Sequence, residues 1–142
     1  MKKLFLDDIR IPFDCSKYMQ PTDLKYIYED EEWDIVRTYN DFVGYIEHFG
    51  LPDLISFDND LADEHYDSDM YSLSDSYNQK YSKFKEKTGY DCAKWLCDYC
   101  VVNSLPLPKY YVHSMNPIGC ENITSVLKVM IKFSVLTISR YL

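Results

Sequence analysis

Three short, largely apolar runs in this chain of 142 residues each end abruptly at polar side chains. The runs and their endings are Leu4–Leu6 before Asp7 and Asp8, Leu54–Phe57 before Asp58, Asn59 and Asp60, and Tyr110–Val112 before His113, Ser114 and Asn116. Runs of this length without a regular polar alternation are typical of strands that a parallel sheet buries on both faces. Because ligands bind beyond the carboxyl ends of the strands in an open parallel sheet, we expect the three polar endings to converge on one site.

The rest of the pattern alternates strands with helices, which predicts an α/β fold with a mostly parallel sheet. Strands are expected over Lys3–Asp7, Trp33–Thr38, Leu54–Asp58 and Lys109–Ser114, and helices over Asp41–Phe49, Thr88–Val102 and Pro117 to about Lys132. Asn40 and Asn116 are the expected N-caps of two of these helices, and Gly50 is the expected end of the first. Two prolines within Ile9–Glu32 predict a short or irregular first crossover, with weak helical character over Thr22–Glu29.

Two segments are compatible with more than one structure. Ser134–Ser139 fits a short fifth strand near the end of the chain. Residues 61–87 form a long polar stretch without a clear period, and loops of this length are usually functional or disordered. This stretch leaves directly from the expected site, so it fits either a lid or a surface insertion. Because the chain shows no internal repeat and no domain boundary, we expect residues 1–142 to form a single domain.

Charge and cysteine content narrow the functional class. A formal charge of −8 argues against binding to duplex DNA or RNA, which needs a basic surface, but leaves small nucleotides and strand ends open. No apolar run approaches the roughly 18 residues of a membrane span, and the apolar run after Lys3 is too short for a signal peptide. We therefore expect a cytoplasmic protein whose five cysteines are reduced. Cys97 and Cys100 fit buried apolar positions better than a zinc or redox site.

The acidic residues after the first and third strands suggest a divalent cation. Asp7 and Asp8 are adjacent, so both reach one site only where the strand ends and turns. Carboxylates gathered in this way repel one another unless a cation neutralises them, and Mg²⁺ is often held by one or two carboxylates and water. We expect Asp7, Asp8 and Asp58 to hold Mg²⁺ or another divalent cation. The alternative is that one aspartate of the pair caps a turn and the other faces solvent.

The other polar residues at the strand ends suit phosphoryl chemistry. Asp58 or Asp60 is the expected nucleophile or general base. His113 is the expected general acid, since nearby carboxylates would raise its pKa. The phosphate is expected to contact Arg10, Ser114 and the helix start at Asn116. The alternatives are that Asp60 closes a turn, that His113 is structural and that Arg10 forms a surface ion pair.

Four motifs occur in a characteristic order between Lys3 and about Lys132. They are Leu4–Arg10, Ser56–Leu61, Thr88–Asp91 and Val112–Pro117. This ordered set resembles the cyclic-phosphate processing receiver domains, which are related to the receiver domains of bacterial response regulators. The resemblance implies a doubly wound, receiver-like sheet in the strand order 2-1-3-4, with activity on cyclic phosphates of nucleotides or RNA ends. It also matches Asp7 and Asp8 to the acidic pair of receivers, Asp58 to the phosphate-accepting residue and Ser114 to the hydroxyl position.

Two departures from response-regulator receivers favour hydrolysis over signalling. Those receivers carry a lysine after the fifth strand, whereas Ser134–Ser139 supplies none and Arg140 is a poor geometric substitute. Asp60 and His113 are additional acid–base groups that a phosphoacceptor pocket does not need. We therefore expect a Mg²⁺-dependent phosphoesterase whose partner is a small phosphorylated ligand or an RNA end. A phosphoacceptor receiver in signalling and a nucleotide-binding module without turnover are the alternatives.

Overall fold

The structure, a computed structural model, describes residues 1–19, 23–62 and 87–141. Four strands in these ranges form one all-parallel sheet in the order β2-β1-β3-β4. The strands are β1 (Lys3–Leu6), β2 (Asp34–Val36), β3 (Leu54–Phe57) and β4 (Lys109–Val112). The central strands β1 and β3 are buried along their whole length, as their apolar sequences indicated. The predicted fold class and strand order are therefore confirmed.

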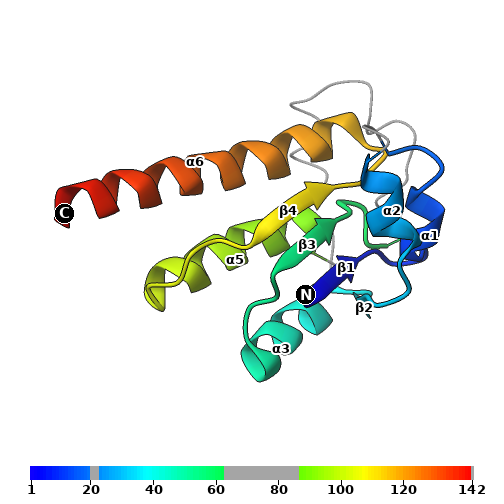
Figure 1. The fold of residues 1–142 in the computed structure, drawn as a ribbon, viewed down its shortest axis with the longest axis horizontal. Coiled ribbons are helices and arrows are strands. Elements are labelled where there is room, and N and C mark those ends of the chain that lie inside the picture. Colours follow the sequence, from blue (N-terminus) through cyan, green and yellow to red (C-terminus); the bar gives the residue numbers. More distant parts are fainter. Residues whose placement is uncertain (20–22, 63–86, 142) are drawn as a thin grey trace.

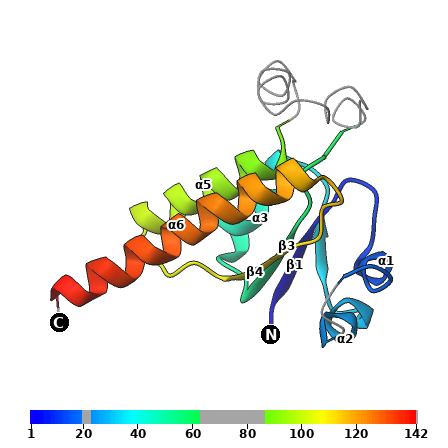
Figure 2. The same cartoon turned by 90° about the horizontal axis from the view of Figure 1, so that it is seen from above.

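Helices cover both faces of the sheet, as a doubly wound fold requires (Figures 1 and 2). They are α1 (Pro12–Cys15), α2 (Asp23–Glu29), α3 (Tyr39–Phe49), α5 (Gly89–Val102) and α6 (Pro117–Tyr141). The side chains of β1 divide between the two faces with the two-residue period of a strand. Phe5 packs with Tyr28 in the smaller core under α1 and α2. Leu4 and Leu6 belong to the larger core under α3, α5 and α6, together with Phe57.

Local capping sets the helix boundaries. The side chain of Thr38 accepts a hydrogen bond from the backbone N of Asp41 at 3.1 Å, so Thr38 is the N-cap of α3 and the prediction of Asn40 is wrong. Both residue types cap helices, and Thr38 takes the position because its backbone is still extended. Gly50 ends α3 with a φ of 84°, as predicted. Thr88 caps α5 through a reciprocal capping box.

The last helix is longer than the sequence predicted. α6 continues to Tyr141, so the predicted end near Lys132 and the predicted fifth strand over Ser134–Ser139 are both wrong. The apolar and β-branched residues of that segment favour a strand in isolation, but extending an existing helix needs no new nucleus. Asn116 is confirmed as the N-cap, because Gly119 N donates to its Oδ1 at 3.1 Å. The C-terminal part of α6 projects past the sheet (Figures 1 and 2).

The first crossover contains the two short helices α1 and α2, in line with the prolines in Ile9–Glu32. Residues 63–86 of the long stretch 61–87 lie outside the described ranges. The predicted alternatives of a lid and a surface insertion both concern these residues. In the parts of the chain that the structure describes, no helix combines the length and apolar character that crossing a membrane requires.

Candidate active site

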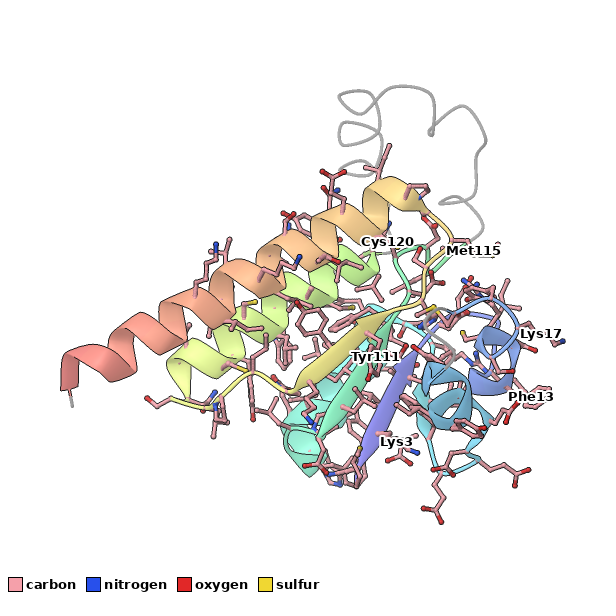
Figure 3. All side chains as sticks on the ribbon, turned by 45° about the horizontal axis from the view of Figure 1, so that its top comes forward. Lys3, Phe13, Lys17, Tyr111, Met115 and Cys120 are labelled. Atoms are coloured by element: carbon pink, nitrogen blue, oxygen red, sulfur yellow. The ribbon has the colours of Figure 1, made fainter. Side chains whose placement is uncertain are left out.

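The polar residues that follow β1, β3 and β4 meet at the carboxyl end of the sheet. Asp7, Asp58 and His113 each place one potential metal-binding atom within 4.8 Å of the others. All three side chains are almost fully buried, with at most 1% of their surface exposed. In Figure 3 this end of the sheet is marked by Met115, in the loop after β4, and the opposite end by Lys3 on β1. The structure thus brings three of the predicted site residues to one point.

Asp7 is held by hydrogen bonds on both carboxylate oxygens. Oδ1 accepts from the backbone N of Ile9 at 2.9 Å and from that of Arg10 at 2.7 Å. Oδ2 accepts from Arg10 Nε at 2.9 Å and lies 3.1 Å from His113 Nε2. Burial alone would raise the pKa of Asp7, but these hydrogen bonds and the charge of Arg10 lower it to about 2. Asp7 is therefore an anion at neutral pH.

Asp58 lies in the same buried cluster but has far fewer hydrogen-bond partners. Its Oδ1 accepts from the backbone N of Asn59 at 2.8 Å. Its Oδ2 is, within the described ranges, the one buried side-chain polar atom without a hydrogen bond. Arg10 Nη2 lies 3.4 Å from this oxygen, which makes an ion pair but not a hydrogen bond. Burial and the charge of Asp7 raise the pKa of Asp58 to about 7, despite the opposing effect of Arg10.

His113 joins Asp7 to a chain of buried hydroxyl groups. Its Nδ1 lies 2.6 Å from Ser56 Oγ, which lies 2.6 Å from the hydroxyl of Tyr28. Because the ionised Asp7 only accepts, Nε2 carries the ring proton, Nδ1 accepts from Ser56, and Ser56 accepts from Tyr28. Burial lowers the pKa of His113 despite the hydrogen bond to Asp7, so the ring is neutral. The ring also stacks on Phe5, with centroids 4.4 Å apart.

This environment bears on the general-acid role predicted for His113. Both ring nitrogens are engaged inside the protein, and the residue has no exposed surface. The geometry therefore favours a residue that holds Asp7 over one that reaches a leaving group. The sequence analysis missed Ser56 and Tyr28 as partners. The available signal was Ser56 itself, a hydroxyl in an otherwise apolar strand, because buried polar groups are almost always hydrogen-bonded.

Asp60, Ser114 and Asn116 form a second group of hydrogen-bonded polar residues at these strand ends. Asn116 Nδ2 donates to Asp60 Oδ1 at 3.3 Å, and Asn116 N donates to Ser114 Oγ at 3.1 Å. The nearby Ser114 hydroxyl partly offsets the rise in the pKa of the Asp58 carboxyl. The three residues are buried. The structure therefore places Asp60 and Ser114 near Asp58 and bonds Asn116 to both of them.

Asp8 and the backbone N–H groups at the start of α6, which were also predicted to belong to the site, are less well placed to bind a ligand there. Asp8 is half-buried and, among the residues that the structure describes, lies outside the cluster of close ligand atoms. The backbone donors expected to hold an anion at the start of α6 are partly engaged. Gly119 N bonds Asn116 Oδ1, and Cys120 N bonds the Asn116 carbonyl at 2.9 Å. An anion at this helix start would have to rely on other donors.

Two glycines let the helices approach the end of β3. A Cβ on Gly89 would lie 1.7 Å from the carbonyl oxygen of Asp58, and one on Gly119 would lie 2.6 Å from the Asn59 side chain. Asn59 joins α5 to the strand end, because its carbonyl accepts from Gly89 N at 2.8 Å and its Oδ1 accepts from Tyr90 N at 3.2 Å. The starts of α5 and α6 are therefore fixed against the strand that carries Asp58.

The donor set fits a hard divalent cation. Such ions prefer oxygen ligands, and Asp7 and Asp58 supply two carboxylates in one pocket. A cation there would satisfy the unbonded Asp58 Oδ2 and remove the repulsion between the two groups. His113 Nε2 carries a proton in this arrangement, so the carboxylates are the better ligands.

An all-parallel sheet in this strand order, with acidic residues after β1 and β3 and a hydroxyl after β4, defines a receiver-like α/β domain. The family model of the cyclic-phosphate processing receiver domain matches residues 2–129. The chain therefore belongs to this family, and the resemblance read from the motifs is confirmed. Comparisons with curated proteins and with solved structures gave no match.

Proposed function

We propose that this protein is a metal-dependent phosphoesterase that opens cyclic phosphates of nucleotides or RNA ends. The observation that carries the proposal is the buried Asp58 Oδ2, which has no hydrogen bond and lies beside the ionised Asp7. A family defined by cyclic-phosphate processing supports the substrate class. Mg²⁺ is the proposed cofactor because it favours carboxylate and water ligands.

The two carboxylates have distinct tasks in this proposal. Asp7 and Asp58 would hold the divalent cation, which would supply charge stabilisation to the phosphoryl oxygens. Asp7 is pre-oriented for this by the backbone after β1 and by His113. Asp58 contributes the oxygen that has no other hydrogen bond. Asp8, half-buried at the same strand end, is proposed to bind through water.

Asp60 is the proposed general base. It is buried, its Oδ1 is held by Asn116, and its charge contributes to the raised pKa of Asp58. As water attacks phosphorus, Asp60 takes a proton from the water while one ring P–O bond breaks. Asp60 then returns the proton to the released ribose oxygen, which leaves a phosphate monoester. His113 holds Asp7 in this scheme, which replaces the general-acid role that its sequence position suggested.

Ser114 and Asn116 are the proposed phosphate contacts. Ser114 lies near Asp58 and Asn116 bonds Asp60, and both polar side chains are short and held in place by the start of α6. Arg10 is the third proposed contact, although its guanidinium faces the carboxylates in this structure. Phosphate binding by Arg10 therefore requires its side chain to move.

Hydrolysis of 2′,3′-cyclic AMP tests the proposal, with the monoester product followed by ³¹P NMR. We expect turnover with Mg²⁺ and none in EDTA. The double variant Asp58→Asn/Asp60→Asn should lose about 100-fold or more of the rate. Asp53 is an exposed residue before β3, at the other end of the sheet. Asp53→Asn is the matched control and should keep the wild-type rate. No turnover by the wild type, or full turnover by the double variant, refutes the proposed reaction.

A phosphoacceptor role for Asp58 is the second candidate, because Asp58 follows β3 where receivers carry their acceptor. In the described part of the chain the sheet ends at β4, so it offers no fifth strand to position a lysine. A stable aspartyl phosphate after treatment with acetyl phosphate would favour this candidate. Tight binding of the cyclic nucleotide with no change to the ligand would instead favour a binding module.

A further inference from the structure

The guanidinium of Arg10 occupies the position that a cation at this site would need. Its Nε lies 2.9 Å from Asp7 Oδ2 and its Nη2 lies 3.4 Å from Asp58 Oδ2. The Oδ1 atom of each carboxylate already accepts backbone hydrogen bonds. Asp7 Oδ1 accepts from the backbone N of Ile9 and of Arg10, and Asp58 Oδ1 accepts from that of Asn59. The two Oδ2 atoms are therefore the better placed to bind a cation, and Arg10 contacts both.

A guanidinium and a divalent cation cannot share these oxygens. Mg²⁺ coordinates carboxylate oxygens at about 2.1 Å and needs a near-ideal octahedral shell, which leaves no space for a guanidinium over the same atoms. The two positive charges would also repel each other strongly in a pocket that is almost fully buried.

We propose that Arg10 is a built-in competitor of the metal. It neutralises Asp7 and Asp58 while no metal is bound, and it leaves the carboxylates when a divalent cation arrives. This inference rests on the metal site of the proposed function and adds how that site is controlled. The released guanidinium presents a planar fork that suits a phosphoryl group. Metal binding and the formation of the phosphate contact are thereby linked.

The surroundings of Arg10 allow its side chain to move while its backbone stays fixed. The side chain is 21% exposed, in contrast to the buried carboxylates beneath it. Arg37 Nη1 donates to the Arg10 carbonyl at 2.6 Å and to that of Asp7 at 3.0 Å, which anchors the backbone. Arg10 Nη1 also donates to the Tyr18 hydroxyl at 2.6 Å. That hydroxyl donates to the His113 carbonyl at 2.8 Å, so Tyr18 keeps a partner after Arg10 has moved.

Calorimetric titration with Mg²⁺ at pH 8, above the pKa of Asp58, tests the competition. Arg10→Met should bind Mg²⁺ about tenfold or more tightly than the wild type, because the competing charge is gone. Lys94→Met is the matched control: it removes one positive charge from α5, where Lys94 pairs with Asp91 at 3.3 Å. Its affinity should stay within about twofold of the wild type, since exposed charges are well screened.

The possible outcomes separate this inference from the proposed function. The competition is overturned if Arg10→Met binds Mg²⁺ no more tightly than the wild type. It is also overturned if Lys94→Met gains as much Mg²⁺ affinity as Arg10→Met. Absence of binding in both the wild type and Arg10→Met refutes the metal site itself. Competition without any hydrolysis of the cyclic nucleotide supports the inference and refutes the proposed reaction. If Arg10→Met does not fold without metal, Arg10→Gln, which keeps donors but no charge, replaces it with the same expectation.

A second measurement uses the wild type alone and does not depend on a variant. The ¹⁵N–¹H signal of Arg10 Nε reports its hydrogen bond to Asp7. We expect this signal to shift towards that of a solvated guanidinium as Mg²⁺ saturates the protein. An unchanged signal at saturation overturns the proposal, because the guanidinium would then still lie on the carboxylate.

Discussion

Asp7 and Asp58 share one buried pocket, yet their carboxyl groups are shifted in opposite directions. The pKa of Asp7 is lowered to about 2 and that of Asp58 is raised to about 7. Burial raises the pKa of both groups, but the hydrogen bonds on both oxygens of Asp7 outweigh it, whereas Asp58 Oδ2 has no hydrogen bond and the charge of Asp7 raises the pKa of Asp58 further. The pocket therefore holds one fixed anion and one carboxyl group that is half ionised near neutral pH. A divalent cation would favour the ionised form of both.

The raised pKa of Asp58 predicts a contribution to stability that falls with pH in the absence of metal, whereas the lowered pKa of His113 contributes in the opposite direction. The folded pKa of about 7 lies above the ordinary value of 3.8, so the folded state holds the proton more tightly. This stabilisation is present below about pH 4 and is lost as the pH rises through about 7, with a total on the order of 4 kcal/mol. The lowered pKa of Asp7 acts only below this window, where stability is lost as the pH falls towards 2.

Urea unfolding in EDTA between pH 4 and pH 8 measures this dependence. Asp58→Asn cannot titrate at this position and is the reference. The free energy of unfolding of the wild type should fall relative to that of Asp58→Asn across the window. Parallel curves for the two proteins would show that Asp58 titrates normally.

Asp58→Asn should stabilise the metal-free protein at pH 8. The change removes a buried charge beside Asp7, and the new amide can donate to the Asp7 carboxylate. We expect a gain of about 1–2 kcal/mol in EDTA and the loss of the stabilisation by Mg²⁺. Thermal unfolding with and without Mg²⁺ measures both, and Asp53→Asn should keep the Mg²⁺ response of the wild type. A Mg²⁺ response that persists in Asp58→Asn places the cation elsewhere.

The series of hydrogen bonds from Tyr28 through Ser56 and His113 to Asp7 predicts a specific role for Ser56. Ser56→Ala leaves His113 Nδ1 and the Tyr28 hydroxyl without their shared partner, which should cost about 1–3 kcal/mol of stability. The ¹⁵N shift of His113 Nδ1 should also move towards that of a ring nitrogen without a hydrogen bond, while Nε2 stays protonated because Asp7 still accepts from it. Ser56→Thr keeps the hydroxyl and should restore the Nδ1 signal. An Nδ1 signal in Ser56→Ala that matches the wild type would mean that Ser56 does not donate to the ring.

Gly89 should tolerate no side chain, because a Cβ would meet the Asp58 carbonyl at 1.7 Å. Gly89→Ala should destabilise the protein by about 3 kcal/mol or more, since the clash is with backbone. Gly44, in the interior of α3, is the matched control, because a Cβ there meets nothing within 4 Å. Gly44→Ala should be neutral or stabilising by up to about 1 kcal/mol. Chemical denaturation of both variants tests the contrast, and similar values for the two would contradict it.

Burial made the sheet predictable from the sequence. Strands covered on both faces must be apolar, so Leu4–Leu6 and the run before Asp58 marked β1 and β3. The position of the site was predictable because the carboxyl ends of parallel strands meet at one edge of the sheet. The end of the chain was not predictable in the same way, because Ser134–Ser139 has local strand propensity while the helix begun at Pro117 continues through it.

Side-chain partners within the pocket could not be read from the sequence. Ser56 lies 28 positions from Tyr28 and 57 positions from His113, and sequence spacing does not show that they touch. Arg10 posed a related problem. An arginine beside several aspartates can reach a phosphate or a carboxylate, and only the packing of the loop after β1 places it on Asp7 and Asp58. Its part in the site therefore emerged only from the structure.

Diffraction from crystals soaked in Mn²⁺ shows whether Asp7 and Asp58 hold a divalent cation together. Manganese takes the oxygen ligands of magnesium and can be located by its anomalous signal. We expect an anomalous peak in contact with Asp7 Oδ2 and Asp58 Oδ2, with the Arg10 guanidinium moved off both atoms. Crystals that bind Mn²⁺ only elsewhere, or that keep Arg10 on the two carboxylates at saturating Mn²⁺, would contradict this expectation.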